Sequence, residues 1–175
     1  MPAIMADGFC QSIDMIAAEL DWTLDAEKRT THEMAVATRA LDTPVGVLDA
    51  GTVAAQRFTW EGLVDGEPVI TVRVNWLMGE EDLDPPWTLG EQGERFEVEI
   101  TGDPTVSLTF KGLQPETVAE GLIRNPGVVS TANHCVSAIP YVCVADAGIK
   151  TYLDLPLIAG RAAAGLHGRG SGPFG

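Results

Sequence analysis

Apolar side chains recur at three- and four-residue steps near the start of the chain. The residues with this spacing are Phe9, Ile13, Ile16, Ala17 and Leu20. Such spacing places the side chains on one stripe of an α-helix, where they can be buried together. The pattern therefore predicts a helix over roughly Phe9–Asp21.

The clearest pattern is a pair of β-rich runs. Thr52–Val64 and Pro68–Met78 are separated by the sequence DGE, and its Asp65-Gly66 pair favours a tight hairpin turn. Alternate residues of a strand share one face. The apolar residues that alternate in this way are Phe58 and Trp60 in the first run and Ile70, Val72, Val74 and Trp76 in the second. We expect the apolar face of this long hairpin to be buried against another element or another chain.

Weaker patterns complete the predicted order of elements. Arg29–Thr38 could form a strand or a helix, and a strand is favoured. The following RALDTPVGVLDAG, with its proline and glycines, is typical of a long connection. Arg95–Thr101 and Thr105–Lys111 predict a second hairpin, and Pro115 opens a helix that ends near Arg124. With a final helix, the order is helix, five strands, two helices. This order predicts an α+β fold with a largely antiparallel or mixed open sheet of about five strands, covered on one face by helices.

The last predicted helix follows the sequence NPG and has two unlike faces. Its apolar side consists of Val128, Val129, Ala132, Cys135, Val136 and Ile139. The opposite side, here called the uncharged stripe, consists of Ser130, Asn133, His134, Ser137 and Tyr141. Pro140 is predicted to kink or end the helix, because proline lacks a backbone donor and crowds the preceding turn.

These elements fit one domain over residues 1–158. The remaining residues, 159–175, are rich in glycine and predict a flexible tail.

Charge and composition exclude several kinds of partner. The chain has 25 Asp and Glu against 11 Lys and Arg, which gives a net charge of −14. Such a surface repels phosphate backbones and anionic lipids, so we expect neither nucleic-acid nor membrane binding. No apolar run is long enough to span a membrane and no signal peptide is evident. The odd number of cysteines, three, favours reduced thiols and a cytoplasmic location.

Three segments have the composition of familiar sites but lack their spacing or context. The run GRGSG lacks the strand before it and the helix after it that a dinucleotide loop needs. The acidic loop of Glu80, Glu81, Asp82 and Asp84 lacks the spacing of an EF-hand and reads as solvated. His134 and Cys135, with Cys143 nearby, do not predict a metal site, because adjacent helical residues diverge and Cys135 reads as a core residue.

The uncharged stripe is the best candidate for a site. Hydroxyl, amide and imidazole groups can hydrogen-bond to a ligand or to another domain without the desolvation cost of burying a full charge. His134 can also donate or accept a proton near neutral pH. The alternative is a helix face that meets water or satisfies buried backbone groups, and the sequence leaves both open.

Three segments carry a resemblance to a known family. They are SIDMIAAELDWTLD, LDAGTVAAQRFTWEGLVDGEPVITVRVNWLMG and NPGVVSTANHCVSAIPYVCVADAGIKTYLDLP. Together they resemble the C-terminal half of NAD(P)-dependent enzymes related to dihydrodipicolinate reductase, in the branch of 2,4-diaminopentanoate dehydrogenase and native amine dehydrogenases. The resemblance implies an α+β substrate domain with an open-sheet dimer interface, joined in such enzymes to a Rossmann domain that binds the nicotinamide.

The sequence also departs from that plan. It contains no strand–GxGxxG–helix unit, and THEMAVAT does not match the HH…K signature of dihydrodipicolinate reductase. We therefore expect that this chain binds no cofactor alone and is a truncated product or one half of a split enzyme. The resemblance transfers no catalytic residue to this sequence.

The leading hypothesis is the substrate-binding and dimerisation half of an NAD(P)-dependent reductase or amine dehydrogenase acting on a C=N or C–N bond, inactive without a Rossmann partner. The expected partners are a second copy bound through the open sheet face, a separate Rossmann-domain chain and a small amine or imine. The substrate-binding candidates are Thr131, Asn133, His134 and Ser137, with Trp60 and Trp76 as apolar walls. Ordinary sheet packing is the alternative for both tryptophans. The alternative function is a non-catalytic homodimeric binding or scaffold protein derived from the same fold.

Overall fold

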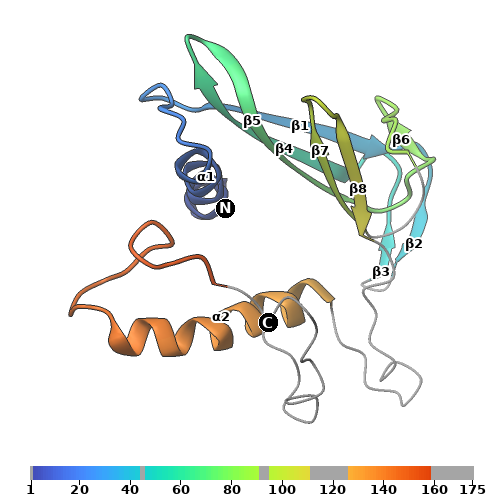
Figure 1. The fold of residues 1–175 in the computed structure, drawn as a ribbon. Coiled ribbons are helices and arrows are strands. Elements are labelled where there is room, and N and C mark those ends of the chain that lie inside the picture. The colour runs from blue at the N-terminus through green and yellow to red at the C-terminus, as the bar shows by residue number, and fades with distance from the viewer. Residues whose placement is uncertain (1, 44–45, 91–94, 111–125, 159–175) are drawn as a thin grey trace. The chain divides into compact units, whose positions relative to one another are not determined.

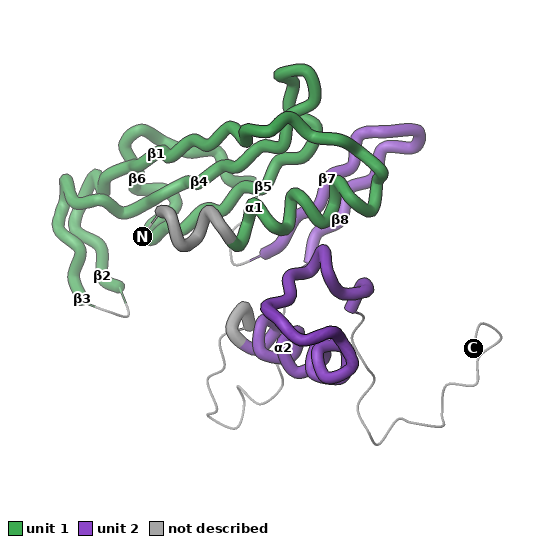
Figure 2. The backbone as a smooth tube through the Cα atoms, turned by 90° about the vertical axis from the view of Figure 1, so that its left-hand side faces the viewer, with its two compact units in different colours: residues 1–92 green, residues 93–175 purple. Residues whose placement is uncertain are grey.

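The structure is a computed structural model that describes residues 2–43, 46–90, 95–110 and 126–158. The chain forms two compact units, Met1–Gln92 and Gly93–Gly175, which are coloured separately in Figure 2. The predicted helix from Pro115 and the predicted tail from residue 159 lie outside the described residues.

The first unit is a helix on an antiparallel sheet (Figure 1). The helix α1 spans Pro2–Glu19. The sheet has the strand order β5-β4-β1-β6. Its strands are β1 (Arg29–Ala37), β4 (Val53–Val64), β5 (Glu67–Leu77) and β6 (Leu83–Asp84). The predicted α+β fold with a largely antiparallel sheet is confirmed, and this sheet has four strands.

The long hairpin β4-β5 forms as its sequence predicts. Phe58 pairs with Val74 and Trp60 with Val72, so the apolar residues of the two strands share one face. At the turn, Asp65 has a φ of 53° and Gly66 a φ of 80°. Positive φ at both central residues matches the twist of the flanking strands and is the reason that Asp-Gly favours this turn.

The helix α1 packs on the apolar face of this hairpin. Ile13 and Ala17 are buried against Phe58, Trp60 and Ile70. The other predicted helix residues differ: Ile16 and Leu20 are exposed, and α1 ends before Leu20. Two of the five apolar residues predicted to be buried on this helix are therefore outside the core. The stripe of α1 that contacts the sheet is narrower than the stripe of apolar residues in the sequence.

Glycine allows the close approach of α1 to β4. A Cβ atom on Gly62 would lie 2.7 Å from Cγ2 of Ile13 and 2.9 Å from Cδ1 of Leu24. Both side chains would have to shift to admit a Cβ atom at this position. Gly62 therefore fixes how closely the helix lies on the sheet.

The loop after α1 is tied to the hairpin turn by Asp25. Its carboxylate accepts hydrogen bonds from the backbone N–H groups of Asp65, at 3.2 Å, and Gly66, at 2.9 Å. Its own N–H donates to the carbonyl of Leu63 at 2.8 Å. These three bonds join segments that are about forty residues apart in sequence.

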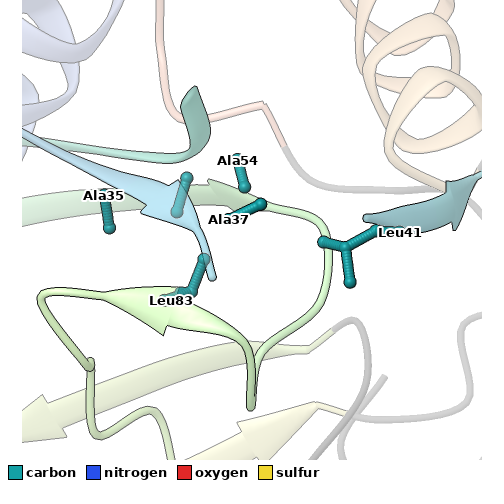
Figure 3. Close-up of a cluster of buried hydrophobic side chains, with 6 residues drawn as sticks. Ala35, Ala37, Leu41, Ala54 and Leu83 are labelled. Atoms are coloured by element: carbon teal, nitrogen blue, oxygen red, sulfur yellow. The ribbon is translucent and has the colours of Figure 1, made fainter. Parts of the chain in front are cut away.

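A second, smaller core lies where β1, β4 and β6 meet (Figure 3). Its buried members are Ala35, Ala37, Leu41, Ala54, Ala55 and Leu83. The predicted connection after β1 contains a short hairpin of its own, β2 (Leu41–Thr43) with β3 (Gly46–Leu48). Leu41 enters the small core from β2.

The second unit contains a hairpin and a helix. The strands β7 (Phe96–Ile100) and β8 (Val106–Phe110) confirm the predicted second hairpin and form a two-stranded sheet of their own. The helix α2 spans Pro126–Val144 and contains Pro140. Of the two alternatives predicted for Pro140, an end of the helix is wrong, because α2 continues to Val144. A kink stays a prediction, since the missing donor removes one backbone hydrogen bond.

Candidate functional site

The first surface of interest is a row of rings across the α1-covered face of the sheet. Phe9 of α1 stacks on Trp60, with ring centroids 4.7 Å apart. Trp60 and Phe58 follow at 5.9 Å, and His32 stacks on Phe58 at 4.3 Å with an interplanar angle of 7°. Trp60 is only 3% exposed. We call these four residues the aromatic row.

The aromatic row extends past the helix into a partly exposed surface. Nε2 of His32 lies 3.1 Å from Oε1 of Gln56. Trp76 packs edge-on against Phe58 at 5.9 Å and is 51% exposed, and Met34 beside them is also half exposed. The result is an uncharged apolar surface with one imidazole.

The two predicted tryptophans therefore have different environments. They share a face, as predicted, but Trp60 is buried beneath α1 and Trp76 is open to solvent. The sequence reasoning did not single out His32 or Gln56. Alternation along β1 could have indicated which residues share a face with His32. Its position directly opposite Phe58 follows from the β1–β4 register.

The second surface is the uncharged stripe of α2. His134 is half-buried, and its ring centroid lies 5.3 Å from that of Tyr152. Ser137 and Tyr141 are also half-buried, whereas Thr131 and the stripe residues Ser130 and Asn133 are exposed. The chain's own segment after α2 therefore covers part of the stripe. The sequence reasoning missed Tyr152.

The apolar side of α2 is open in this structure. Val136 is 64% exposed and Ile139 is 56% exposed. Cys135 is exposed as well, so its predicted place in the core is wrong. Apolar periodicity indicates which residues share a helix face but not whether that face is buried. No described part of the second unit covers the apolar side of α2.

The segment that covers His134 is held by a tight turn at Thr151–Asp154. One carboxylate oxygen of Asp154 accepts from the backbone N–H and from the hydroxyl of Thr151, each at 2.8 Å. These two hydrogen bonds, and to a lesser extent the charge of Lys150, hold the pKa of Asp154 below its ordinary value of 3.8. The turn places Tyr152 beside α2.

The lowered pKa makes this turn acid-sensitive. Because the folded-state pKa is depressed, the stabilisation is complete above the unfolded-state pKa and is lost as the pH falls through the folded-state value. We expect the Asp154 carboxyl carbon to titrate below pH 3.8 in an NMR titration. Thr151→Val, which removes the hydroxyl donor, is expected to raise this pKa toward 3.8. An unchanged titration in the variant would contradict the assignment.

A third feature is a shallow hollow beside β2. It has a volume of about 490 Å³ and is lined by Arg39, Leu41, Asp42, Thr43, Met78, Gly79 and Asp82. Arg39 donates from Nε and Nη2 to the two carboxylate oxygens of Asp82, both at 2.8 Å. These hydrogen bonds and the charge of Asp82 raise the pKa of Arg39. The two opposite charges satisfy each other, so the hollow offers no unpaired charge from this pair.

The described residues do not form a cofactor cradle. A dinucleotide loop joins the end of a strand to the start of a helix through close-packed glycines. The described helices begin at Pro2 and Pro126, and the described chain contains no such junction before either. GRGSG lies outside the described residues. In the described ranges, no three His, Cys, Asp or Glu side chains are grouped to hold a metal ion.

None of the helices described here is both long enough and apolar enough to cross a bilayer.

Comparison with known proteins decides the family. The family model described as the 2,4-diaminopentanoate dehydrogenase C-terminal domain matches residues 5–166. The chain belongs to this family. The predicted resemblance is confirmed. The matched residues include Trp60, Trp76 and the whole of the uncharged stripe.

Two curated relatives agree with this assignment. The chain is 31% identical over 172 residues to an amine dehydrogenase of Streptomyces virginiae, covering 97% of this chain and 45% of that protein. It is 31% identical over 150 residues to a 2,4-diaminopentanoate dehydrogenase of Acetoanaerobium sticklandii, covering 86% of this chain and 37% of that protein. The chain therefore spans less than half the length of these relatives.

A solved structure supports the fold. An amine dehydrogenase from Mycobacterium smegmatis matches with a TM-score of 0.52 and 22% identity, over 85% of this chain and 38% of that one. This likeness supports the fold alone, and the family assignment rests on the family model and the curated relatives.

Proposed function

We propose that this chain is the substrate-binding and dimerisation half of an NAD(P)-dependent reductase or amine dehydrogenase acting on a C=N or C–N bond. One observation carries the proposal: a C-terminal dehydrogenase domain matches residues 5–166, while the chain covers 45% and 37% of two curated relatives. The proposal includes a cytoplasmic location, which the three cysteines favour.

The nicotinamide belongs to a separate Rossmann-domain chain in this proposal. When bound there, it donates or accepts the hydride. The described residues of this chain do not fit a dinucleotide, so their work is to bind the amine or imine, to orient it and to exclude water.

Two surfaces of this chain are proposed to contact substrate. On α2 these are Thr131, Asn133, His134 and Ser137, whose neutral groups can hydrogen-bond without the cost of burying a charge. On the sheet it is Trp76, whose half-exposed ring gives an apolar wall. Trp60 is buried, so it supports this wall through Phe58 rather than touching a ligand.

A cofactor-binding experiment tests whether the nicotinamide is bound by a separate chain and not by this one. The purified chain is titrated with NADH and with NADPH, and nucleotide fluorescence is recorded. We expect no binding by this chain alone. Amine-dependent reduction of NAD⁺ or NADP⁺ is expected only after a separate chain with a strand–GxGxxG–helix unit is added. Saturable nucleotide binding by the chain alone would overturn the proposal.

The second candidate function is a non-catalytic homodimeric binding or scaffold protein. It is favoured by the sheet face opposite α1, where no helix of the described residues of the first unit packs. On this face Arg73 makes no ion pair within the described residues. A dimer that gives no turnover with any Rossmann-domain chain would support this candidate over the first.

A further inference from the structure

The aromatic row ends on a part of the sheet that α1 leaves exposed. Two rows of side chains, each directly opposite one another across β1, β4 and β5, form this part, here called the open aromatic surface. They are Met34, Gln56 and Trp76 in one row and His32, Phe58 and Val74 in the next. Trp76 is 51% exposed and Met34 is 54% exposed. None of the six residues is an aspartate, glutamate, lysine or arginine.

His32 offers a hydrogen-bond acceptor on this surface. Its Nε2 lies 3.1 Å from Oε1 of Gln56. An amide oxygen can only accept a hydrogen bond, so Nε2 carries the proton and donates it. In the neutral ring the other nitrogen, Nδ1, then holds a lone pair, and no described residue donates a hydrogen bond to it. Stacking on Phe58, with an interplanar angle of 7°, orients the ring.

The indole of Trp76 supplies a second attraction for a cation. The face of an aromatic ring is the negative part of its quadrupole, and an ammonium group over an indole is stabilised more than over other rings. Trp76 packs against Phe58 with an interplanar angle of 72°, and about half of it stays exposed. Because His32 and Trp76 both contact Phe58, one small molecule can reach both.

The charge of the chain selects the sign of the ligand. A net charge of −14 attracts cations and repels anions, and the two rows contain no lysine or arginine for a carboxylate or phosphate. A metal ion fits poorly, since in the described ranges no three His, Cys, Asp or Glu side chains are grouped to hold one. An organic ammonium needs only an acceptor and a ring face, and its hydrocarbon part can contact Met34.

We infer that the open aromatic surface binds the ammonium group of a small apolar amine, which donates a hydrogen bond to Nδ1 of His32 and contacts the ring of Trp76. The inference rests on the proposed function for the role of this amine as a substrate. It deepens that proposal by naming the side chains that hold the amino group on the sheet.

Titration of the purified chain with phenethylammonium chloride tests the inference. The backbone and indole N–H signals in proton–nitrogen correlation NMR report binding, and a saturable shift of the Trp76 indole signal is expected. Phenethyl alcohol has a similar shape without the charge and is expected to bind about 10-fold more weakly, because the cation–π contact and the long-range attraction are lost. Phenylacetate, an anion, is expected to cause no shift.

Variants attribute the binding to named side chains. His32→Phe keeps a ring to stack on Phe58 but lacks the acceptor, so it is expected to weaken ammonium binding about 5- to 10-fold. Trp76→Leu, at a half-exposed position, is expected to weaken it by a similar factor. Trp22→Leu is the matched control: it removes an indole that is 45% exposed in the segment after α1 and is expected to leave binding unchanged. Circular dichroism checks that each variant is folded.

The results distinguish this inference from the proposed function. No saturable shift, equal affinity for the three probes, or unchanged binding by both His32→Phe and Trp76→Leu would overturn the inference. Amine-dependent turnover with a Rossmann-domain chain, without ammonium binding at this surface, would overturn the inference and leave the proposed function standing. Ammonium binding that depends on His32 and Trp76 supports the inference even where nucleotide binding by this chain alone overturns the proposed function.

Discussion

Trp60→Ala is expected to lower the free energy of unfolding by about 3–5 kcal/mol. The indole is buried between α1 and the sheet, and it stacks on Phe9 at 4.7 Å and on Phe58 at 5.9 Å. Its removal leaves a cavity where the helix meets the hairpin. Urea denaturation followed by far-UV circular dichroism measures the loss.

Trp76→Ala is the matched control, since it removes the same side chain from the same face. Trp76 is half exposed, so a loss of about 1 kcal/mol is expected. If Trp76 is an apolar wall for substrate, this variant also raises KM in the reconstituted enzyme. Equal stability losses in the two variants would contradict the described burial.

Asn133→Asp is expected to lower reconstituted turnover at least about 10-fold, because it places a full charge on a surface proposed to be enclosed in the assembled enzyme. His134→Glu should act in the same way. Asn133 is exposed in this chain, so its change is expected to alter the free energy of unfolding by only about 0.5 kcal/mol. Amine-dependent formation of NADH or NADPH gives the rate, and thermal denaturation gives the stability.

The neutral variant Asn133→Ser separates charge from shape at this position. It keeps a hydrogen-bonding group and is expected to retain most of the turnover. If Asn133→Asp and Asn133→Ser have the same activity as the wild type, the uncharged stripe meets water in the assembled enzyme and does not contact substrate.

Local patterns predicted the strands well. Alternation placed Phe58, Trp60, Val72 and Val74 on one face, and the Asp-Gly pair placed the turn, because both signals act over a few residues. The same locality explains an error in α1. Periodicity included Leu20 in the helix stripe, whereas the helix ends at Glu19.

Contacts between distant segments were not predictable in this way. The strand β6 is two residues long and pairs with Val36 and Ala37 of β1, which no periodicity indicates. The His32–Gln56 contact and the placement of Tyr152 on His134 likewise depend on strand register and on a turn after α2. The family resemblance indicated the candidate helix but none of these partners.

Five charged residues of the three long strands lie on the sheet face opposite α1, and this pattern favours one pairing of the strands during folding. They are Arg29, Glu33, Arg57, Glu61 and Arg73. A slip of β1 by a single residue against β4 would turn Arg29 and Glu33 to the α1 side of the sheet and would turn His32 and Met34 to the opposite side. Arg29 would then lose its ion pair with Glu61, and His32 would lose its stacking on Phe58. The misaligned pairing of β1 with β4 is therefore less stable than the observed one.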